Sequence, residues 1–310
     1  MSRGWKVGIA TTIVVFTLSV GMWFTIAYIS ADAILNPSPP RNLPFLADQA
    51  FAAQAVEFPA RDGVAIGALW VPTVAPAGVQ LTQTRRPTIV LLHGYGDTRD
   101  ALLPQAELLV NAGFNALIVD FRGHGTSGGE VAALGTLDVN DVLGAVDYLM
   151  TRPDVDTARI GLHGVSMGAA AGIIAAGQDL RVRGMIAEEP VSSLHDAVWT
   201  AYRDRLGLPA FLFRDITLWL VERRLSEPLS EVSPVEAAAR LTPRPLLVIE
   251  RSGEVPVEPG GAERLMRAAG EPKELWVSPE FNQTGDGSPI SPAYAIRVLS
   301  FWRTALGIAS

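Results

Sequence analysis

The sequence contains no cysteine among its 310 residues, which excludes disulfide bonds and thiolate nucleophiles. It also lacks an HExxH motif and any other clustered spacing of histidines and carboxylates, so we expect no metal site. The glycines Gly123, Gly125 and Gly128 have the spacing of a dinucleotide fingerprint, but no partner acidic residue follows at the end of a next strand. We therefore expect no cofactor.

Basic charge is scarce as well. The net charge is −7, and no stripe of lysine and arginine is present to neutralise phosphates, so we expect no nucleic-acid partner. Hydrophobic residues make up 48% of the sequence, which is enough to bury the core of one full-sized domain.

An uncharged apolar segment lies near the N-terminus. Val7–Ile29 is 23 residues long, enough to cross a hydrocarbon core of about 30 Å. A cleavable signal peptide has an apolar region of only about 7–15 residues, although the small residues Ala31–Ala33 keep cleavage open as the alternative. Because Arg3 and Lys6 precede the segment, we expect a cytoplasmic N-terminus and an extracytoplasmic globular part.

The rest of the chain divides into a tether and one domain. We predict a transmembrane anchor over residues 1–30, a proline-rich tether over 31–54 and an α/β domain over 55–310. In the domain, apolar strand patterns alternate with helical ones, which is typical of a mostly parallel sheet covered on both faces. Residues 191–241 interrupt this alternation with aromatic, helical sequence, so we predict a helical lid over the carboxyl ends of the strands.

A candidate nucleophile stands in the motif Gly164–Gly168, which reads G-x-S-x-G. The motif follows a predicted strand and opens a predicted helix, as a nucleophile elbow requires, so Ser166 is the candidate nucleophile. The segment His93–Gly96 ends an earlier strand. Its backbone should deliver the N–H of Tyr95 toward Ser166, where this group and the N–H of Met167 would form an oxyanion hole.

The loop Asp120–Ser127 follows the next predicted strand. We interpret it as scaffold near the site, with Asp120 paired to Arg122. His124 in this loop, like His93 and His163, is expected to be structural.

Four segments together resemble the α/β-hydrolase family: HGYGD, DFRGHGTSGG, GLHGVSMGAA and GAERLMRAAGEPKELW. The resemblance covers about Ala55–Leu306 and is to the serine aminopeptidase-like and lysophospholipase-like bacterial branch, many members of which carry an N-terminal membrane anchor. It implies an eight-stranded sheet and a Ser–acid–His triad in that chain order. It also implies hydrolysis of carboxylic esters, thioesters or peptides, with a small-molecule or peptide acyl substrate.

The sequence departs from the family pattern at two positions. In the loop expected to carry the acid, ERSGEVPVEPGG, Glu254 is the first candidate and Glu258 the second. At the position of the histidine, after the last predicted strand, stands Gln283. A glutamine side chain hydrogen-bonds a serine hydroxyl but does not accept its proton at neutral pH.

Replacement bases are few, because none of the four histidines follows residue 195. His195, at the start of the predicted lid, is the alternative base, and Glu188 and Glu189 at the end of a strand are further candidates. Three hypotheses stay open: a membrane-anchored serine hydrolase with a displaced base, a pseudoenzyme that binds a ligand or partner at the membrane, and a purely structural domain. The intact elbow argues against the last, because a strained turn costs stability.

Overall fold

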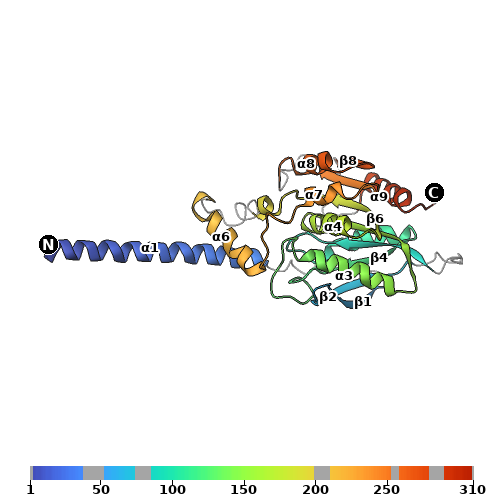
Figure 1. Cartoon of the computed structure of the whole chain (residues 1–310). Coiled ribbons are helices and arrows are strands. Elements are labelled where there is room, and N and C mark those ends of the chain that lie inside the picture. The colour runs from blue at the N-terminus through green and yellow to red at the C-terminus, as the bar shows by residue number, and fades with distance from the viewer. Residues whose placement is uncertain are drawn as a thin grey trace.

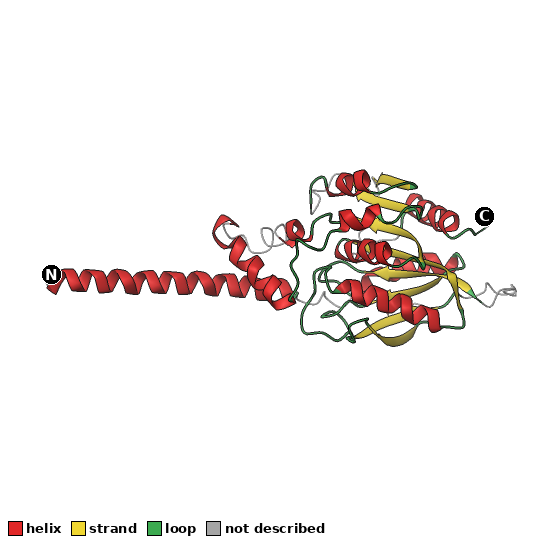
Figure 2. Cartoon of the chain, in the orientation of Figure 1, coloured by secondary structure: helices red, strands yellow, loops and turns green. Residues whose placement is uncertain are grey.

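The computed structural model describes residues 3–37, 52–73, 85–198, 210–252, 258–278 and 290–308, with the side chains of 210–212 excepted. Figure 1 shows a long N-terminal helix that projects from a layered domain, and Figure 2 shows helices on both sides of the domain's sheet.

The sheet has eight strands in the order β1-β2-β4-β3-β5-β6-β7-β8. β2 runs antiparallel to β1 and β4, and all other neighbours are parallel. This confirms the predicted mostly parallel sheet and the eight strands that the resemblance implies. The strands are β1 (Gln54–Pro59), β2 (Ala65–Val71), β3 (Arg86–Leu92), β4 (Asn115–Val119), β5 (Val155–Val165), β6 (Val182–Glu188), β7 (Leu246–Arg251) and β8 (Lys273–Ser278).

The helices pack on both faces of this sheet. One face carries α3, α4, α7 and α8, and the other carries α2 and α9. The described helices are α1 (Arg3–Leu35), the 3₁₀ helix η2 (Arg99–Leu102), α2 (Leu103–Asn111), α3 (Asp138–Thr151), α4 (Met167–Gln178), α6 (Ala210–Leu225), α7 (Pro234–Ala239), α8 (Gly261–Ala268) and α9 (Pro292–Ala305).

The central strand β3 shows why the apolar runs form this sheet. Ile89, Val90, Leu91 and Leu92 are all fully buried. Side chains alternate along a strand, so Val90 and Leu92 enter the core on one face while Ile89 and Leu91 enter the core on the other. A continuous apolar run is therefore required wherever helices cover both faces.

Helix α1 is long and apolar enough to cross a membrane by length and composition, with a mean hydropathy of 1.9 in its most apolar window. The helix continues to Leu35, five residues into the segment predicted as tether, and the anchor boundary at residue 30 stays a prediction. The reason is packing: Ala31, Ile34 and Leu35 are buried against the domain, which extends the helix into the segment predicted as tether. Residues 38–51 of that segment lie outside the described residues.

The described part of the insertion predicted at residues 191–241 contains helices, and these have different neighbours. α7 packs on α4, where Ala237 approaches Gly177, and so belongs to the helical layer on the sheet. α6 instead lies beside the C-terminal part of α1, next to the domain (Figure 1).

Candidate active site

Ser166 stands on a strained turn between β5 and α4. This turn, Val165–Met167, is here called the nucleophile turn because Ser166 is the candidate nucleophile. The backbone of Ser166 has φ 50° and ψ −110°, a conformation that costs a non-glycine residue roughly 1–3 kcal/mol. Its own N–H donates to the carbonyl of Glu188 at 2.8 Å, which ties the turn to the end of β6. The serine is half-buried while its neighbours Val165 and Met167 are buried, so the turn brings this one side chain toward the surface.

The two glycines of the motif are required by close backbone packing. A Cβ on Gly164 would lie 2.4 Å from the carbonyl oxygen of Gly168, and one on Gly168 would lie 2.4 Å from that of Leu92. Real Cβ atoms do not approach this closely, so larger residues would push α4 away from β5 and β3. The spacing G-x-S-x-G is thus explained by the approach of one helix to two strands.

The loop His93–Asp97, here called the oxyanion loop, lies against the turn. A Cβ on Gly94 would lie 3.8 Å from the Cβ of Ser166. His93 holds one side of the loop: its Nδ1 lies 2.7 Å from the Gly94 carbonyl and its Nε2 accepts from the Phe121 N–H at 3.0 Å. His124 holds the other side by accepting from the Gly96 N–H at 3.3 Å.

Both of these histidines are neutral and structural, as predicted. Burial, and next the charge of His124, lowers the pKa of His93 to about 4. Burial also lowers the pKa of His124. A neutral ring has one N–H and one acceptor nitrogen, which matches the bonding of each ring to one carbonyl and one N–H group.

The predicted ion pair between Asp120 and Arg122 is wrong. Arg122 pairs with Asp141 at 2.6 Å and with Asp62 at 2.7 Å. Asp120 instead accepts hydrogen bonds from the backbone of Arg99 at 2.8 Å and of Thr126 at 2.9 Å. Asp120 therefore holds the loops after β3 and β4 together.

No described side chain forms a hydrogen bond with the Oγ of Ser166. His195 has its Nδ1 3.4 Å from Asp196 and 3.4 Å from Arg214, so the structure places it within the insertion. Glu189 pairs with Arg251 at 3.3 Å. Neither candidate base is bonded to the serine.

Glu188 lies inside the core. Its Oε1 is 2.6 Å from Nε2 of His163 and also accepts from the hydroxyl of Tyr294. All three side chains are at most 2% exposed. Because the Glu188 backbone also receives the Ser166 N–H, this buried cluster lies directly behind the nucleophile turn.

Of the two candidate acids, only Glu258 lies within the described residues. Glu258 is 6% exposed, and its carboxylate accepts from the backbone of Ser192 at 2.5 Å and from the backbone of Ser193 at 3.1 Å. It also binds the Arg264 guanidinium. Glu258 thus anchors the start of the insertion. Glu254 and Gln283 lie outside the described residues.

Asp97 is a titratable residue beside the turn that the sequence analysis did not single out. Its Oδ2 and the Cβ of Ser166 both lie within 4 Å of the point that a Gly94 Cβ would occupy. The sequence could have indicated Asp97, because it is the last residue of HGYGD, the segment expected to approach Ser166.

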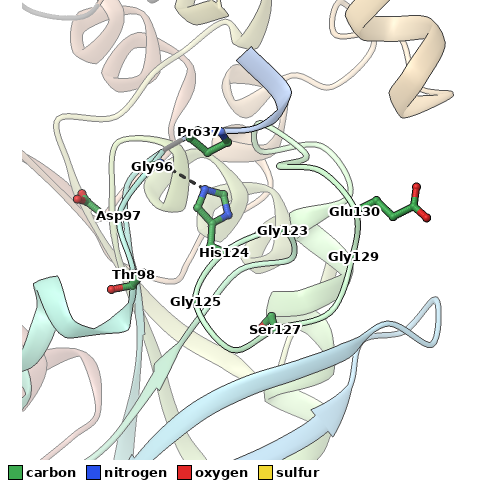
Figure 3. A pocket seen from close by; sticks show the side chains of 10 residues that line it. All are labelled: Pro37, Gly96, Asp97, Thr98, Gly123, His124, Gly125, Ser127, Gly129 and Glu130. Atoms are coloured by element: carbon green, nitrogen blue, oxygen red, sulfur yellow. Dashed lines mark hydrogen bonds between the residues drawn. The ribbon is translucent and has the colours of Figure 1, made fainter. Parts of the chain in front are cut away.

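A cavity of about 290 Å³ adjoins the oxyanion loop on its other side. Figure 3 shows His124 at its centre, bonded to Gly96, with Pro37 nearby. The carboxylates of Asp97 and Glu130 point away from His124. Ser166 does not line this cavity, which we therefore distinguish from the nucleophile site. Among the described residues, no group of three or more histidines and carboxylates is arranged to hold a metal ion.

Comparison with known proteins agrees with this geometry. Residues 83–226, which include the oxyanion loop and the nucleophile turn, match the family model for serine aminopeptidase, S33. This segment of the chain is similar to that family of α/β hydrolases.

Two related bacterial proteins align with most of this chain. The uncharacterised protein YfhR of Escherichia coli K12 is 27% identical over 256 residues, which cover 82% of this chain and 77% of YfhR. The uncharacterised protein YqkD of Bacillus subtilis is 27% identical over 193 residues, 62% of this chain. The match spans 63% of YqkD, slightly less than two thirds of its length.

Solved structures show the same fold. The Pf2001 esterase of Pyrococcus furiosus matches with a TM-score of 0.68 at 23% identity, covering 88% of this chain and 99% of the esterase. An acetyl xylan esterase from Paenibacillus sp. R4 matches with a TM-score of 0.63 at 19% identity, covering 91% and 94%. The chain has the α/β-hydrolase fold, which it shares with these two esterases.

Proposed function

We propose that this protein is a membrane-anchored serine hydrolase of carboxylic esters in which Ser166 is the nucleophile. One observation carries the proposal: Ser166 keeps a strained backbone at φ 50° and remains half-exposed between buried neighbours. Such strain persists only where surrounding packing enforces it, and it is concentrated at functional sites. The esterase-like fold supports the same reaction class.

The proposed chemistry follows from the groups around the turn. The Oγ of Ser166 attacks the ester carbonyl, and the negative charge on the carbonyl oxygen is met by the N–H groups of Tyr95 and Met167. Met167 is the first residue of α4, where N–H groups have no acceptor within the helix and the helix dipole favours negative charge. The alcohol leaves, and water then releases the acid from the acyl-serine.

The proton of Ser166 needs an acceptor other than a triad histidine, because Gln283 occupies that position in the sequence. In serine hydrolases, loss of the histidine lowers turnover on the order of 10⁶-fold. We therefore expect slow turnover, and we assign Asp97, Glu254 and His195 as the side chains to test as acceptors.

We also propose that α1 stays attached as a membrane anchor, with the N-terminus in the cytoplasm and the domain outside. Ala27, Ala31, Ile34 and Leu35 support retention, because they are buried against the domain. Cleavage near Ala31–Ala33 would remove part of this packing. The orientation is supported by Arg3 and Lys6, which precede the apolar segment.

A second candidate is a catalytically impaired domain that binds an acyl ligand or a partner at the membrane. The observation that favours it is the lack of any described hydrogen bond to the Oγ of Ser166, together with Gln283 in place of a base. The two candidates differ in the reactivity of the serine.

The decisive experiment is labelling of the full chain in lipid nanodiscs with a fluorophosphonate probe. The hydrolase proposal predicts labelling that Ser166→Ala abolishes. Asp97→Asn, Glu254→Gln and His195→Asn, compared at pH 5 to 9, then identify the proton acceptor as the variant that lowers the labelling rate. Gln283→His should raise the rate by about 10²-fold or more, because general base catalysis contributes this much.

A folded wild type that shows no labelling would contradict the hydrolase proposal. If Gln283→His then restores labelling, the oxyanion hole and the turn are intact, and the binding function becomes the conclusion. Labelling that persists in Ser166→Ala would show that another residue reacts.

A further inference from the structure

The C-terminal end of α1 is bound to the oxyanion loop. The hydroxyl of Tyr95 donates to the carbonyl of Ile34 at 2.6 Å, and the N–H of Ala132 donates to the carbonyl of Leu35 at 2.8 Å. Carbonyls in the last turn of a helix have no partner within it. In α1, two of these carbonyls are satisfied by loops of the domain.

The same end of α1 is packed into the domain by its side chains. Ala27, Ala31, Ile34 and Leu35 are at most 6% exposed. They belong to one apolar cluster that also contains Ala170, whose N–H donates to the carbonyl of Ser166 at 3.1 Å. The cluster therefore runs without interruption from the anchor helix to the helix that begins at the nucleophile turn.

Helix α6 holds α1 from the other side. Phe213 of α6 packs against Trp23 with ring centroids 5.8 Å apart. Nearer the domain, Arg224 pairs with Asp32 at 2.8 Å and lies over the ring of Tyr28 at 4.5 Å. Figure 1 shows α6 beside this part of α1. The end of α1 is thus enclosed by α6 and the domain.

The exposed part of α1 matches one bilayer in length. The uncharged residues Val7–Ile26 precede Ala27, the first residue of α1 buried against the domain, and these 20 residues of helix span roughly 30 Å. Ile34 lies seven residues beyond Ala27, or about 10 Å along the helix axis. A membrane around the exposed part would therefore place Ile34, whose carbonyl binds the hydroxyl of Tyr95, within about 10 Å of its surface.

We propose that Tyr95 is a positioning residue through which the anchor helix sets the geometry of the oxyanion loop. His93 holds Gly94, His124 holds Gly96, and between them the side chain of Tyr95 is held by α1. The N–H that would stabilise the oxyanion belongs to this same Tyr95. The anchor is then a structural part of the active site, and its docking keeps that N–H directed at the nucleophile turn.

This inference rests on the proposed function for its catalytic consequence but not for the coupling itself. The test compares Tyr95→Phe with wild type in nanodiscs. Tyr148→Phe is the matched control, because its hydroxyl accepts from Arg152 at 2.8 Å at the end of α3. The first readout is amide hydrogen exchange in residues 93–98, which requires no catalysis. Exchange there should become about 10-fold faster in Tyr95→Phe and stay unchanged in Tyr148→Phe.

The second readout is the saturation kinetics of fluorophosphonate labelling. Tyr95→Phe should lower the maximal rate by about 10-fold while the half-saturating probe concentration stays the same. The reason is that the hydroxyl positions the backbone N–H of Tyr95, and this N–H stabilises the transition state rather than the bound probe. The melting temperature should fall by no more than about 4 °C. Ala31→Asp, which places a charge in the α1 interface, should reproduce the faster exchange with Tyr95 intact.

The outcomes separate the two proposals. If Tyr95→Phe leaves both exchange and labelling as in wild type, the positioning role is overturned. If the wild type is unlabelled but Tyr95→Phe accelerates exchange in residues 93–98, the hydrolase proposal fails while the coupling of anchor and loop stands. If Ala31→Asp leaves exchange unchanged, the helix does not act on the loop.

Discussion

At the scale of single residues, the geometry of the site depends on two glycines that leave space for close packing and on two histidines that stay neutral. Gly164 and Gly168 leave the space in which α4 approaches β5 and β3, and neutral His93 and His124 hold the oxyanion loop. The structure also holds buried carboxyl groups, with no proposed part in catalysis, whose pKa values are raised by burial.

Asp138 is the clearest of these. It is fully buried at the start of α3, where its Oδ2 accepts from the Gly135 N–H. Burial, and next the charge of Asp141, raises the pKa of Asp138 to about 7, against the opposing effect of Arg122. The folded protein therefore holds a proton that the unfolded chain releases near pH 4, and this contribution to stability is lost as pH rises from about 4 to 7.

We therefore expect Asp138→Asn to become more stable relative to wild type as pH rises. An asparagine still accepts from Gly135 and has no proton to lose, so the difference in unfolding free energy should shift in its favour on the order of 2 kcal/mol between pH 5 and pH 8. Thermal unfolding in detergent micelles at a series of pH values measures it. Asp141, Asp62 and Arg122 are present in both proteins, so their own contributions to stability largely cancel. A difference that is independent of pH would contradict the buried proton.

At the scale of elements, three parts of the fold meet behind the nucleophile turn. His163 comes from β5, Glu188 from β6 and Tyr294 from α9, and Glu188 accepts from both of the others. From the sequence, Glu188 is a candidate base at the end of a strand. In the structure, the side chain of this last residue of β6 turns into the core beneath α9, where it is fully buried.

Tyr294→Phe tests whether this cluster holds the elements together. Burial, and next the charge of Glu188, raises the pKa of Tyr294 well above its usual range, so the phenol stays protonated and donates. Removing it leaves Glu188 short of a buried donor, which should lower the free energy of unfolding by about 1–3 kcal/mol.

Tyr148→Phe serves again as the control, because Tyr148 is only part-buried and its ring still stacks on Phe58. It should cost less than about 1 kcal/mol. Equal melting temperatures for the two variants would show that the hydrogen bond to Glu188 contributes nothing.

At the scale of the whole molecule, α1 divides into an exposed N-terminal part and a C-terminal part that is packed on the domain. Ala27, Ala31, Ile34 and Leu35 form an apolar cluster with Phe213, Val221 and Leu225 of α6. A chain shortened before β1 would expose that face of α6, although the sequence analysis places the globular part from residue 55 on.

Two shortened chains test this boundary. A chain that begins at residue 22 keeps the buried end of α1, whereas one that begins at residue 52 loses it. Burying Ile34 and Leu35 contributes about 1.5–3 kcal/mol each, so the shorter chain should melt at a clearly lower temperature and bind more of a hydrophobic dye. Equal melting temperatures and equal dye binding would mean that the domain ends where β1 begins.

Much of the fold followed from the chain itself. Apolar runs such as Pro87–Gly94 predicted buried parallel strands, because a sheet covered on both faces needs side chains of one kind on both sides. The pattern Gly164–Gly168 between a strand and a helix predicted the nucleophile turn. Both predictions depend on neighbours in the chain, and local sequence is sufficient for them.

The tertiary structure decided which distant groups meet. Arg122 pairs with Asp62 and Asp141, Glu258 binds Ser192, and Tyr95 binds the end of α1. These partners lie 19 to 66 positions apart in the chain. The sequence by itself determined the elements and the turn, and it predicts Gln283 at the position of the usual histidine, because each is a local pattern. Only the folded chain determined the pairing of charges and the docking of α1, because these depend on which surfaces packing brings into contact.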